Sequence, residues 1–148
     1  MVDRIIKKLP YTDPFLFVDN IESVTENSIV GNYTFKKNES FYPGHFKKNP
    51  VTPGVILTEC CAQIGLVCLG IYLLQKEGTN FQEMLIALSS SEMQFLLPVY
   101  PLETVTVTSS KIYFRFNKLK CSVKMHNEKG AVVCTGILSG MLKEKTNE

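Results

Sequence analysis

The sequence predicts an α+β fold in which an antiparallel sheet curls around one long hydrophobic helix. Residues Gly54–Leu74 form a single long apolar run, and strand-like segments follow it in series. A helix that is apolar on nearly every side is either membrane-bound or wrapped by protein. Glu59 and Gln63 lie inside the run, and an ionisable residue in a membrane segment costs about 2.5 kcal/mol or more. We therefore expect the sheet to wrap the helix, without membrane insertion.

The predicted strands lie on both sides of this helix in the chain. Ile21–Val24 and Ile29–Phe35 flank a short polar turn, which is typical of a hairpin. Pro53 precedes the helix and Gly78 follows it, as expected for a helix start and end. Later strands, the last two joined by a turn at 127–130, are expected at Met84–Phe95, Thr104–Phe116, Lys120–His126 and Ala131–Leu142.

Length, charge and cysteine content narrow the class of protein. A chain of 148 residues predicts one domain spanning residues 1–148. A formal net charge of +2 is too balanced for a general nucleic-acid binder. The five cysteines are odd in number and form no CxxC motif, which favours a reducing compartment. Met1–Lys8 is charged and no apolar stretch follows it, so we expect no secretory signal and a cytoplasmic location.

Two residues could carry acid–base chemistry. His45 lies in a Pro/Gly segment flanked by aromatic residues, which can hold an imidazole in its neutral, base-competent form. Taken alone, a histidine in such a loop is more often structural. Glu59 falls in the second turn of the apolar helix, so it is either a satisfied structural acid or a proton donor kept neutral by burial. Together they could remove one proton and deliver another.

Neighbouring groups suit this chemistry. Gln63 lies one helical turn beyond Glu59 and could orient it by a hydrogen bond. The backbone N–H of Gly54, at the positive end of the helix dipole, could stabilise an oxyanion on a carbonyl. Cys60 and Cys61 should be inert thiols beside a carboxylate, and no cluster has metal-ligand spacing. These features suit proton abstraction next to a carbonyl, but spacing alone does not name the reaction.

Four segments together resemble a known family. Leu9–Asp19 is similar to the motif LPHRxPFLLVD, and Gly44–Val55 is similar to GHFPxxPxMPGV. Leu57–Gln63 resembles IEAxAQ, and Phe95–Val99 resembles FxxPV. With these motifs, which lie between Leu9 and Val99, the chain resembles the 3-hydroxyacyl-acyl-carrier-protein dehydratases of the FabZ type, which have the hotdog fold. The resemblance covers essentially the whole chain.

The resemblance implies a reaction and a role for each residue. His45 would be the base and Glu59 the acid in dehydrating a (3R)-hydroxyacyl thioester to the trans-2-enoyl thioester, in fatty-acid or related polyene or pigment synthesis. The Gly54 N–H would hold the thioester carbonyl, and Gln63 would support Glu59. The residues assigned to substrate binding are Gly54, Gln63, Phe46 and Val55.

The resemblance also implies partners. The substrate would be carried on the 4'-phosphopantetheine arm of an acyl carrier protein, with no metal or organic cofactor. The family works as a homodimer, often assembled further into a trimer of dimers, and the histidine and glutamate come from opposite subunits. Lys47 and Lys48 follow His45 closely and are the preferred contacts for an acidic carrier.

Departures from the family pattern leave other functions open. Lys47 replaces a proline, Thr52 replaces a methionine, and Leu96 and Leu97 replace a basic pair. These changes leave chain-length preference and carrier contacts undetermined. One alternative is a hotdog thioesterase, against which the retained His45 argues. Another is a catalytically silent acyl-binding subunit of a heterodimeric dehydratase, which the presence of both acid–base residues disfavours.

Overall fold

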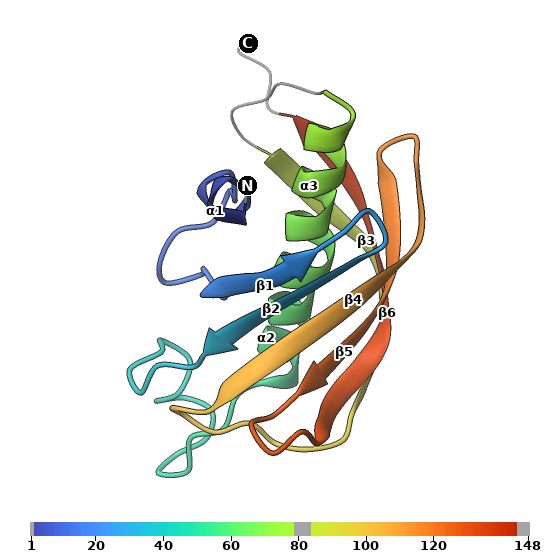
Figure 1. Ribbon diagram of the computed structural model, residues 1–148. Helices are drawn as coiled ribbons and strands as arrows, with labels where there is room; N and C mark the ends of the chain where they lie inside the picture. Colours follow the sequence, from blue (N-terminus) through green and yellow to red (C-terminus); the bar gives the residue numbers. More distant parts are fainter. Residues whose placement is uncertain (1, 79–83, 145–148) are drawn as a thin grey trace.

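The computed structural model describes residues 2–78 and 84–144. Within these ranges six antiparallel strands form one sheet, in the order β1-β2-β4-β5-β6-β3, which curls around a central helix (Figure 1). The predicted fold class is confirmed. The strands are β1 (Asn20–Val24), β2 (Ser28–Thr34), β3 (Met84–Phe95), β4 (Thr104–Arg115), β5 (Lys118–His126) and β6 (Val132–Glu144).

The central helix runs without a break through three segments. It begins as α2 (Gly54–Ala62), continues through the π-helical segment η1 (Gln63–Cys68) and ends as α3 (Leu69–Lys76). By length and composition alone this helix of 23 residues could cross a membrane, but 72% of the apolar 18-residue window within it is buried inside the protein. The helix is therefore the core of the fold, as expected from the polar residues within it.

Alternate side chains of the strands point inward and pack around this helix. Inward-facing residues of β4 and β5, such as Val107 and Leu119, are fully buried, and each such aliphatic side chain contributes about 1.5–3 kcal/mol. Gly65 lets the helix approach the sheet closely, because a Cβ there would lie 2.9 Å from Val123 Cγ1. Ser109 Oγ donates a hydrogen bond of 3.0 Å to the Gly65 carbonyl, within the segment where the helical hydrogen bonding changes.

The N-terminal region contains a short helix that the sequence did not predict. This helix, α1 (Val2–Lys7), buries Ile5 completely in the core. The following segment brings Phe17 into an aromatic cluster, with its ring centroid 5.6 Å from Tyr33 and 6.4 Å from Phe35. Phe17 thereby fixes the N-terminal segment beside the central helix.

The connection between β4 and β5 is tighter than predicted. It consists of Phe116 and Asn117, and both have left-handed backbone angles, with φ of 53° and 58°. Two consecutive left-handed residues characterise the turn that best matches the twist of a hairpin, and glycine usually occupies one of the positions. The sequence has no glycine here, so the turn was not recognisable and β5 begins at Lys118.

The sheet ends in two edge strands, β1 and β3, and β3 is the longer of the two. β3 pairs with β6 on one side only, and its apolar residues Leu85, Leu88 and Phe95 are 44%, 47% and 48% exposed. A long apolar edge strand presents unpaired backbone groups and is a template for pairing with another chain. The described chain contains no element that covers this edge.

Candidate active site

Glu59 and Gln63 form a polar pair on the apolar central helix. They lie one helical turn apart, and Gln63 Nε2 donates a hydrogen bond of 2.9 Å to Glu59 Oε2. Gln63 is fully buried, whereas Glu59 is only partly buried. Glu59 therefore keeps some exposed surface, while the buried Gln63 amide holds its carboxyl group by a hydrogen bond.

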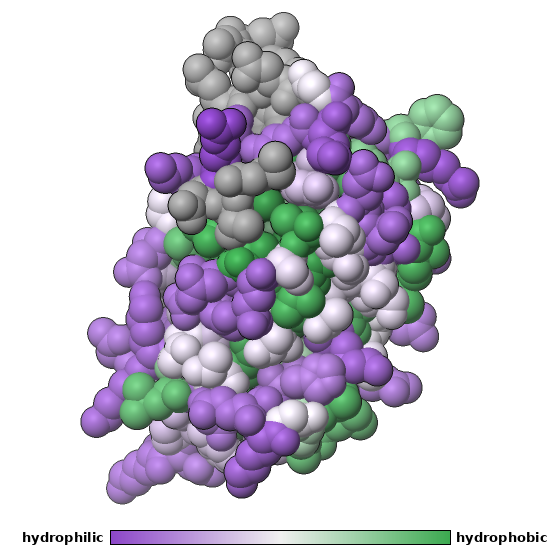
Figure 2. Space-filling view, in the orientation of Figure 1, coloured by the Kyte–Doolittle hydropathy of each residue, from purple (hydrophilic) through white to green (hydrophobic). Residues whose placement is uncertain are grey.

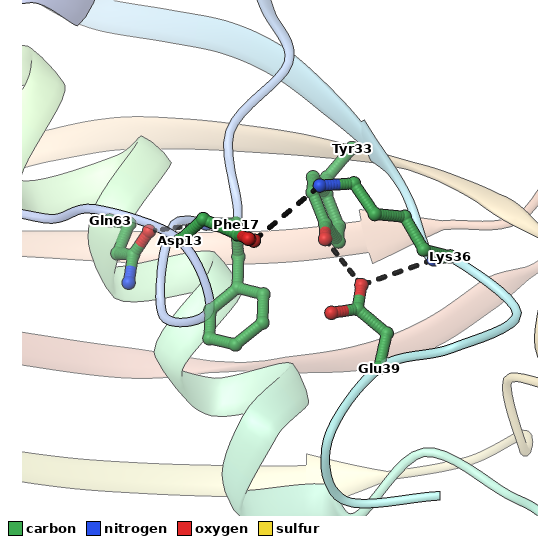
Figure 3. A network of polar contacts seen from close by, with 6 residues as sticks. All are labelled: Asp13, Phe17, Tyr33, Lys36, Glu39 and Gln63. Atoms are coloured by element: carbon green, nitrogen blue, oxygen red, sulfur yellow. Dashed lines mark hydrogen bonds and ion pairs between the residues drawn. The ribbon is translucent and has the colours of Figure 1, made fainter.

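The backbone of the N-terminal segment fixes the orientation of the Gln63 amide. Its Oε1 accepts a hydrogen bond of 2.8 Å from the Phe17 N–H (Figure 3). Its Nε2 donates one of 2.9 Å to the Phe15 carbonyl. A backbone N–H can only donate and a carbonyl can only accept, so the amide has one consistent orientation. Its remaining N–H must point at Glu59, which leaves the other carboxyl oxygen, Oε1, to carry a proton.

The loop after β2 fixes the orientation of the His45 ring. His45 Nδ1 lies 2.8 Å from the Val51 carbonyl, and the Val51 N–H donates back to the His45 carbonyl at 2.9 Å. Because a carbonyl only accepts, Nδ1 donates the proton of this hydrogen bond, so a ring that carries one proton has Nε2 as its acceptor. The rings of His45 and Phe46 stack with centroids 4.0 Å apart. The imidazole is thus held in one tautomer by its own loop.

A pocket opens at the start of the central helix. Its volume is about 290 Å³, and its lining includes Thr52, Gly54, Leu57 and Phe95. The Phe95 ring lies over the first helical turn, and a Cβ at Gly54 would come within 3.3 Å of it. Among the described residues, nothing accepts a hydrogen bond from the Gly54 N–H. This N–H can therefore bind an oxygen atom at the mouth of the pocket.

The other residues expected at the site lie around this region. Phe46 is 56% exposed and Val55 is 76% exposed, so both can contact a ligand or another chain. Lys47 and Lys48 are also exposed. Lys48 borders a second pocket of about 530 Å³ beside residues 45–51, which we call the histidine loop. Gln63, expected to bind substrate, has no exposed surface in one chain, and its link to the site is the hydrogen bond to Glu59.

Comparison with known proteins places the chain in a family. Residues 9–135, most of the chain, match the FabA-like domain. The chain belongs to the FabA-like family. The resemblance found in the sequence motifs is confirmed.

Relatives of this FabA-like chain include 3-hydroxyacyl-[acyl-carrier-protein] dehydratases named FabZ. The FabZ of Ehrlichia chaffeensis is 32% identical over 147 residues, covering 97% of this chain and 95% of the relative. The FabZ of Clostridium perfringens is 32% identical over 139 residues, covering 91% of this chain and 93% of the relative. These relatives match the chain along nearly its whole length.

Solved structures confirm the hotdog fold. The dehydratase heterocomplex ApeI:P from Xenorhabdus doucetiae superposes with a TM-score of 0.78 at 13% identity, covering 97% of this chain and 91% of that chain. A hypothetical thioesterase from Streptococcus pneumoniae superposes with a TM-score of 0.64 at 16% identity, covering 86% and 88%. Both dehydratases and thioesterases share this fold, so the residues of the site must distinguish the two activities.

The environment of Glu59 in this FabA-like chain favours a protonated acid. Burial raises the pKa of Glu59 above its ordinary value, and the hydrogen bond from Gln63 partly opposes this shift. Burial and then the charge of Glu59 raise the pKa of Tyr11, which places the tyrosine near the carboxyl group. The sequence reasoning did not single out Tyr11, although it replaces the histidine of the opening motif.

A second carboxyl group that the sequence reasoning missed supports the histidine loop. Glu39 is almost completely buried; it accepts a hydrogen bond from the Tyr33 hydroxyl and one of 3.1 Å from the Lys36 N–H (Figure 3). Lys36 Nζ also lies 3.6 Å from Asp13, an exposed pair that contributes little. Both hydrogen-bond partners of Glu39 precede His45 in the chain, so these bonds fix the segment that leads from β2 to the histidine loop.

Cys60 and Cys61, which follow Glu59 in the chain, are poor candidates for a reactive group because their thiol pKa values are raised. All five are buried free thiols, and burial raises the pKa of the Cys60 thiol, which sits beside Glu59 in the sequence. Within residues 2–78 and 84–144, no group of three or more histidine, cysteine or carboxylate side chains could hold a metal ion. The acid–base pair remains the best candidate for chemistry.

Gln63→Leu is expected to lower kcat about 10- to 150-fold, because the amide stabilises the carboxylate that forms as Glu59 gives up its proton, and the loss of one hydrogen bond to a charged group costs roughly 1.5–3 kcal/mol. The amide favours the charged form of Glu59, so its removal should raise the pKa of Glu59 further. The pH profile of kcat should then move to higher pH, a shift that a purely structural role would not cause. A reduced kcat with an unchanged profile would rule out the positioning role.

Proposed function

We propose that this protein dehydrates (3R)-hydroxyacyl thioesters on an acyl carrier protein to trans-2-enoyl thioesters, in fatty-acid or related synthesis. The single observation that supports it most strongly is the held acid: Glu59, with a raised pKa, is fixed by an amide that the backbone orients. A thioesterase needs a carboxylate that activates water, whereas a dehydratase needs a carboxylic acid that protonates a leaving hydroxyl.

Each residue has a defined step in this reaction. The Gly54 N–H binds the thioester carbonyl oxygen and stabilises the charge that develops there. His45 Nε2 removes a proton from C2, and the electron pair of that C–H bond becomes the C2=C3 double bond. The C3–O bond breaks as Glu59 gives its proton to the hydroxyl, which leaves as water. Both residues return to their starting protonation states when the two protons are exchanged with solvent.

The proposal includes a dimer joined through β3. His45 and Glu59 share no hydrogen bond within the described part of one chain. The open apolar β3 edge can pair with the same edge of a second copy, and Phe95, at its end, already borders the pocket at Gly54. In this homodimer His45 of one copy faces Glu59 of the partner subunit. Further assembly into a trimer of dimers and a cytoplasmic location are parts of the same proposal.

Carrier recognition is assigned to the lysines after the base. Lys47 and Lys48 are exposed on the histidine loop, where they can pair with carboxylates of an acidic carrier protein. Thioester delivery to His45 would then place the carrier beside this loop. Phe46 and Val55, both exposed near the same end of the helix, are proposed contacts for the acyl-pantetheine substrate.

Mass spectrometry of the product tests the proposed function. The purified full-length chain is incubated with (3R)-hydroxyacyl carrier proteins of several chain lengths, and the bound acyl group is analysed. Loss of one water from the acyl group is the expected result. Release of a free acid would identify a thioesterase instead. Unchanged substrate at every chain length would point to a silent subunit and contradict the proposal.

A further inference from the structure

The tip of the β4–β5 hairpin exposes a large apolar side chain. Phe116 is 92% exposed in a left-handed turn, a backbone conformation that glycine and asparagine adopt at lower cost. The tip projects at the upper right of Figure 1, and Figure 2 shows apolar surface there beside strongly hydrophilic surface. Neither the core nor the turn geometry requires a phenylalanine at this position.

Cations gather on the outward face of the same hairpin. Arg115 lies directly opposite Lys118, an arrangement of like charges that is unfavourable in an isolated sheet. The next pair on the same face of the sheet is Tyr113 opposite Lys120. The Arg115 guanidinium carbon lies 4.5 Å from the Tyr113 ring centroid. The hairpin therefore has two locally unfavourable features side by side, an exposed phenylalanine and a pair of adjacent cations. Residues that are unfavourable for local stability often belong to a functional surface.

The same surface continues across the sheet. Lys118 pairs with Met141 of β6, which is 43% exposed, and Lys143 pairs with Leu85 at the edge. In the described parts of β3 to β6, strand alternation places one carboxylate on the outward face, Glu92, several rows away from the turn. We call this surface the hairpin patch; it comprises Arg115, Phe116, Lys118, Lys120, Met141 and Lys143.

We propose that the hairpin patch binds the surface of a membrane that contains anionic phospholipids. Phe116 would enter the headgroup region while the cations contact lipid phosphates, the combination by which peripheral proteins bind anionic bilayers. The tip of the β4–β5 hairpin lies near the α3 end of the central helix, whereas α2 begins at the opposite end (Figure 1). The pocket lined by Gly54, the first residue of α2, is therefore far from the hairpin patch. A carrier protein that delivers substrate to that pocket has no reason to dock here, and two copies of a cationic patch repel each other.

Vesicle sedimentation tests this proposal without relying on enzymatic activity. The full chain is mixed with vesicles of phosphatidylcholine alone, or of phosphatidylcholine and phosphatidylglycerol in equal parts. We expect binding to the anionic vesicles to be at least about tenfold tighter than to the neutral ones, and to weaken as salt is added. Equal binding to both vesicle types, or binding to neither, would overturn the proposal.

Two variants that should keep the fold test whether the hairpin patch is the part of the protein that binds the vesicles. Phe116→Asn suits the left-handed turn, so its melting temperature should rise by about 2–4 °C while vesicle binding weakens about tenfold. Lys118→Glu creates a favourable pair with Arg115 and should weaken binding about fivefold or more. Lys129→Glu is the matched control, since Lys129 is exposed in the turn at the other end of β5 and its reversal should leave binding unchanged.

Other occupants of the patch would give different results. If Lys118→Glu changed the molecular mass in solution, measured by light scattering, the patch would be a contact between copies and the membrane proposal would be wrong. Tight binding to an acidic carrier protein that is lost in Phe116→Asn, with no binding to anionic vesicles, would also overturn it. Vesicle binding that is equal in wild type and both variants would exclude the patch as the membrane contact.

Discussion

Glu59→Gln is expected to lower kcat for dehydration by about 10²–10⁴-fold, the usual contribution of one acid–base group. The amide has the same shape as the carboxyl group and can still accept the hydrogen bond from Gln63 Nε2, but it cannot protonate a leaving hydroxyl. The measurement is single-turnover formation of the enoyl thioester by mass spectrometry, with circular dichroism to verify folding. Near-normal turnover in this variant would contradict the role of Glu59 as the acid.

The pH dependence of the wild type should carry the signature of Glu59. Because burial raises its pKa, the acid form persists to higher pH than in an ordinary glutamate, and kcat should fall as the pH rises through this value. Between the unfolded and the folded pKa the native state binds more protons, so stability is greatest below this window and declines as pH rises through it. Both effects should be absent in Glu59→Gln, whose denaturation can be compared with wild type across this pH range.

His45→Ala is expected to cause a loss of similar size, about 10²–10⁴-fold in kcat, because it removes the base. Alanine also removes the hydrogen bond from Nδ1 to the Val51 carbonyl, so a second variant separates the two effects. His45→Asn provides an amide N–H for the same carbonyl but no base, and it should be equally inactive with the loop bond retained. If His45→Asn turned over at a near-normal rate, the imidazole would not be the base.

Mixing the two inactive variants tests whether the site lies between subunits. Homodimers of His45→Ala and Glu59→Gln each lack a complete pair. A mixed dimer joins the intact His45 of one copy with the intact Glu59 of the partner subunit, so one of its two sites is complete. Co-expression should therefore restore a substantial part of the wild-type activity. Activity that stays at the level of either variant would mean that both residues act within one chain.

The main architecture was predictable because it depends on short-range patterns. The apolar run Gly54–Leu74 and the strand alternation around it specify a wrapped helix, and β3 has the predicted bounds, Met84–Phe95. The π-helical turns at Gln63–Cys68 follow from no pattern of this kind, because they depend on how closely the helix packs on the sheet at Gly65. Helix α1 was missed because its stability comes from burying Ile5 against the rest of the fold.

The sequence indicated candidate residues for the site but not the hydrogen bonds that orient them. Motif resemblance indicated His45, Glu59 and Gln63, and helical spacing placed the last two on one face. The partners that orient them could not be predicted in the same way. Gln63 is fixed by backbone groups 46 and 48 residues away, and the His45 tautomer depends on how its loop closes on the Val51 carbonyl. Their roles in catalysis remain predictions that the variants above test.

The open edge of β3 has a consequence for how the protein behaves on dilution. A chain whose apolar edge is covered only by a second copy gains its final stability from association, so its melting temperature should depend on protein concentration. Where each site takes one residue from each copy, the rate per chain should also fall as dimers separate, even while single chains keep their secondary structure. In dilute solution the loss of activity should therefore precede the loss of fold.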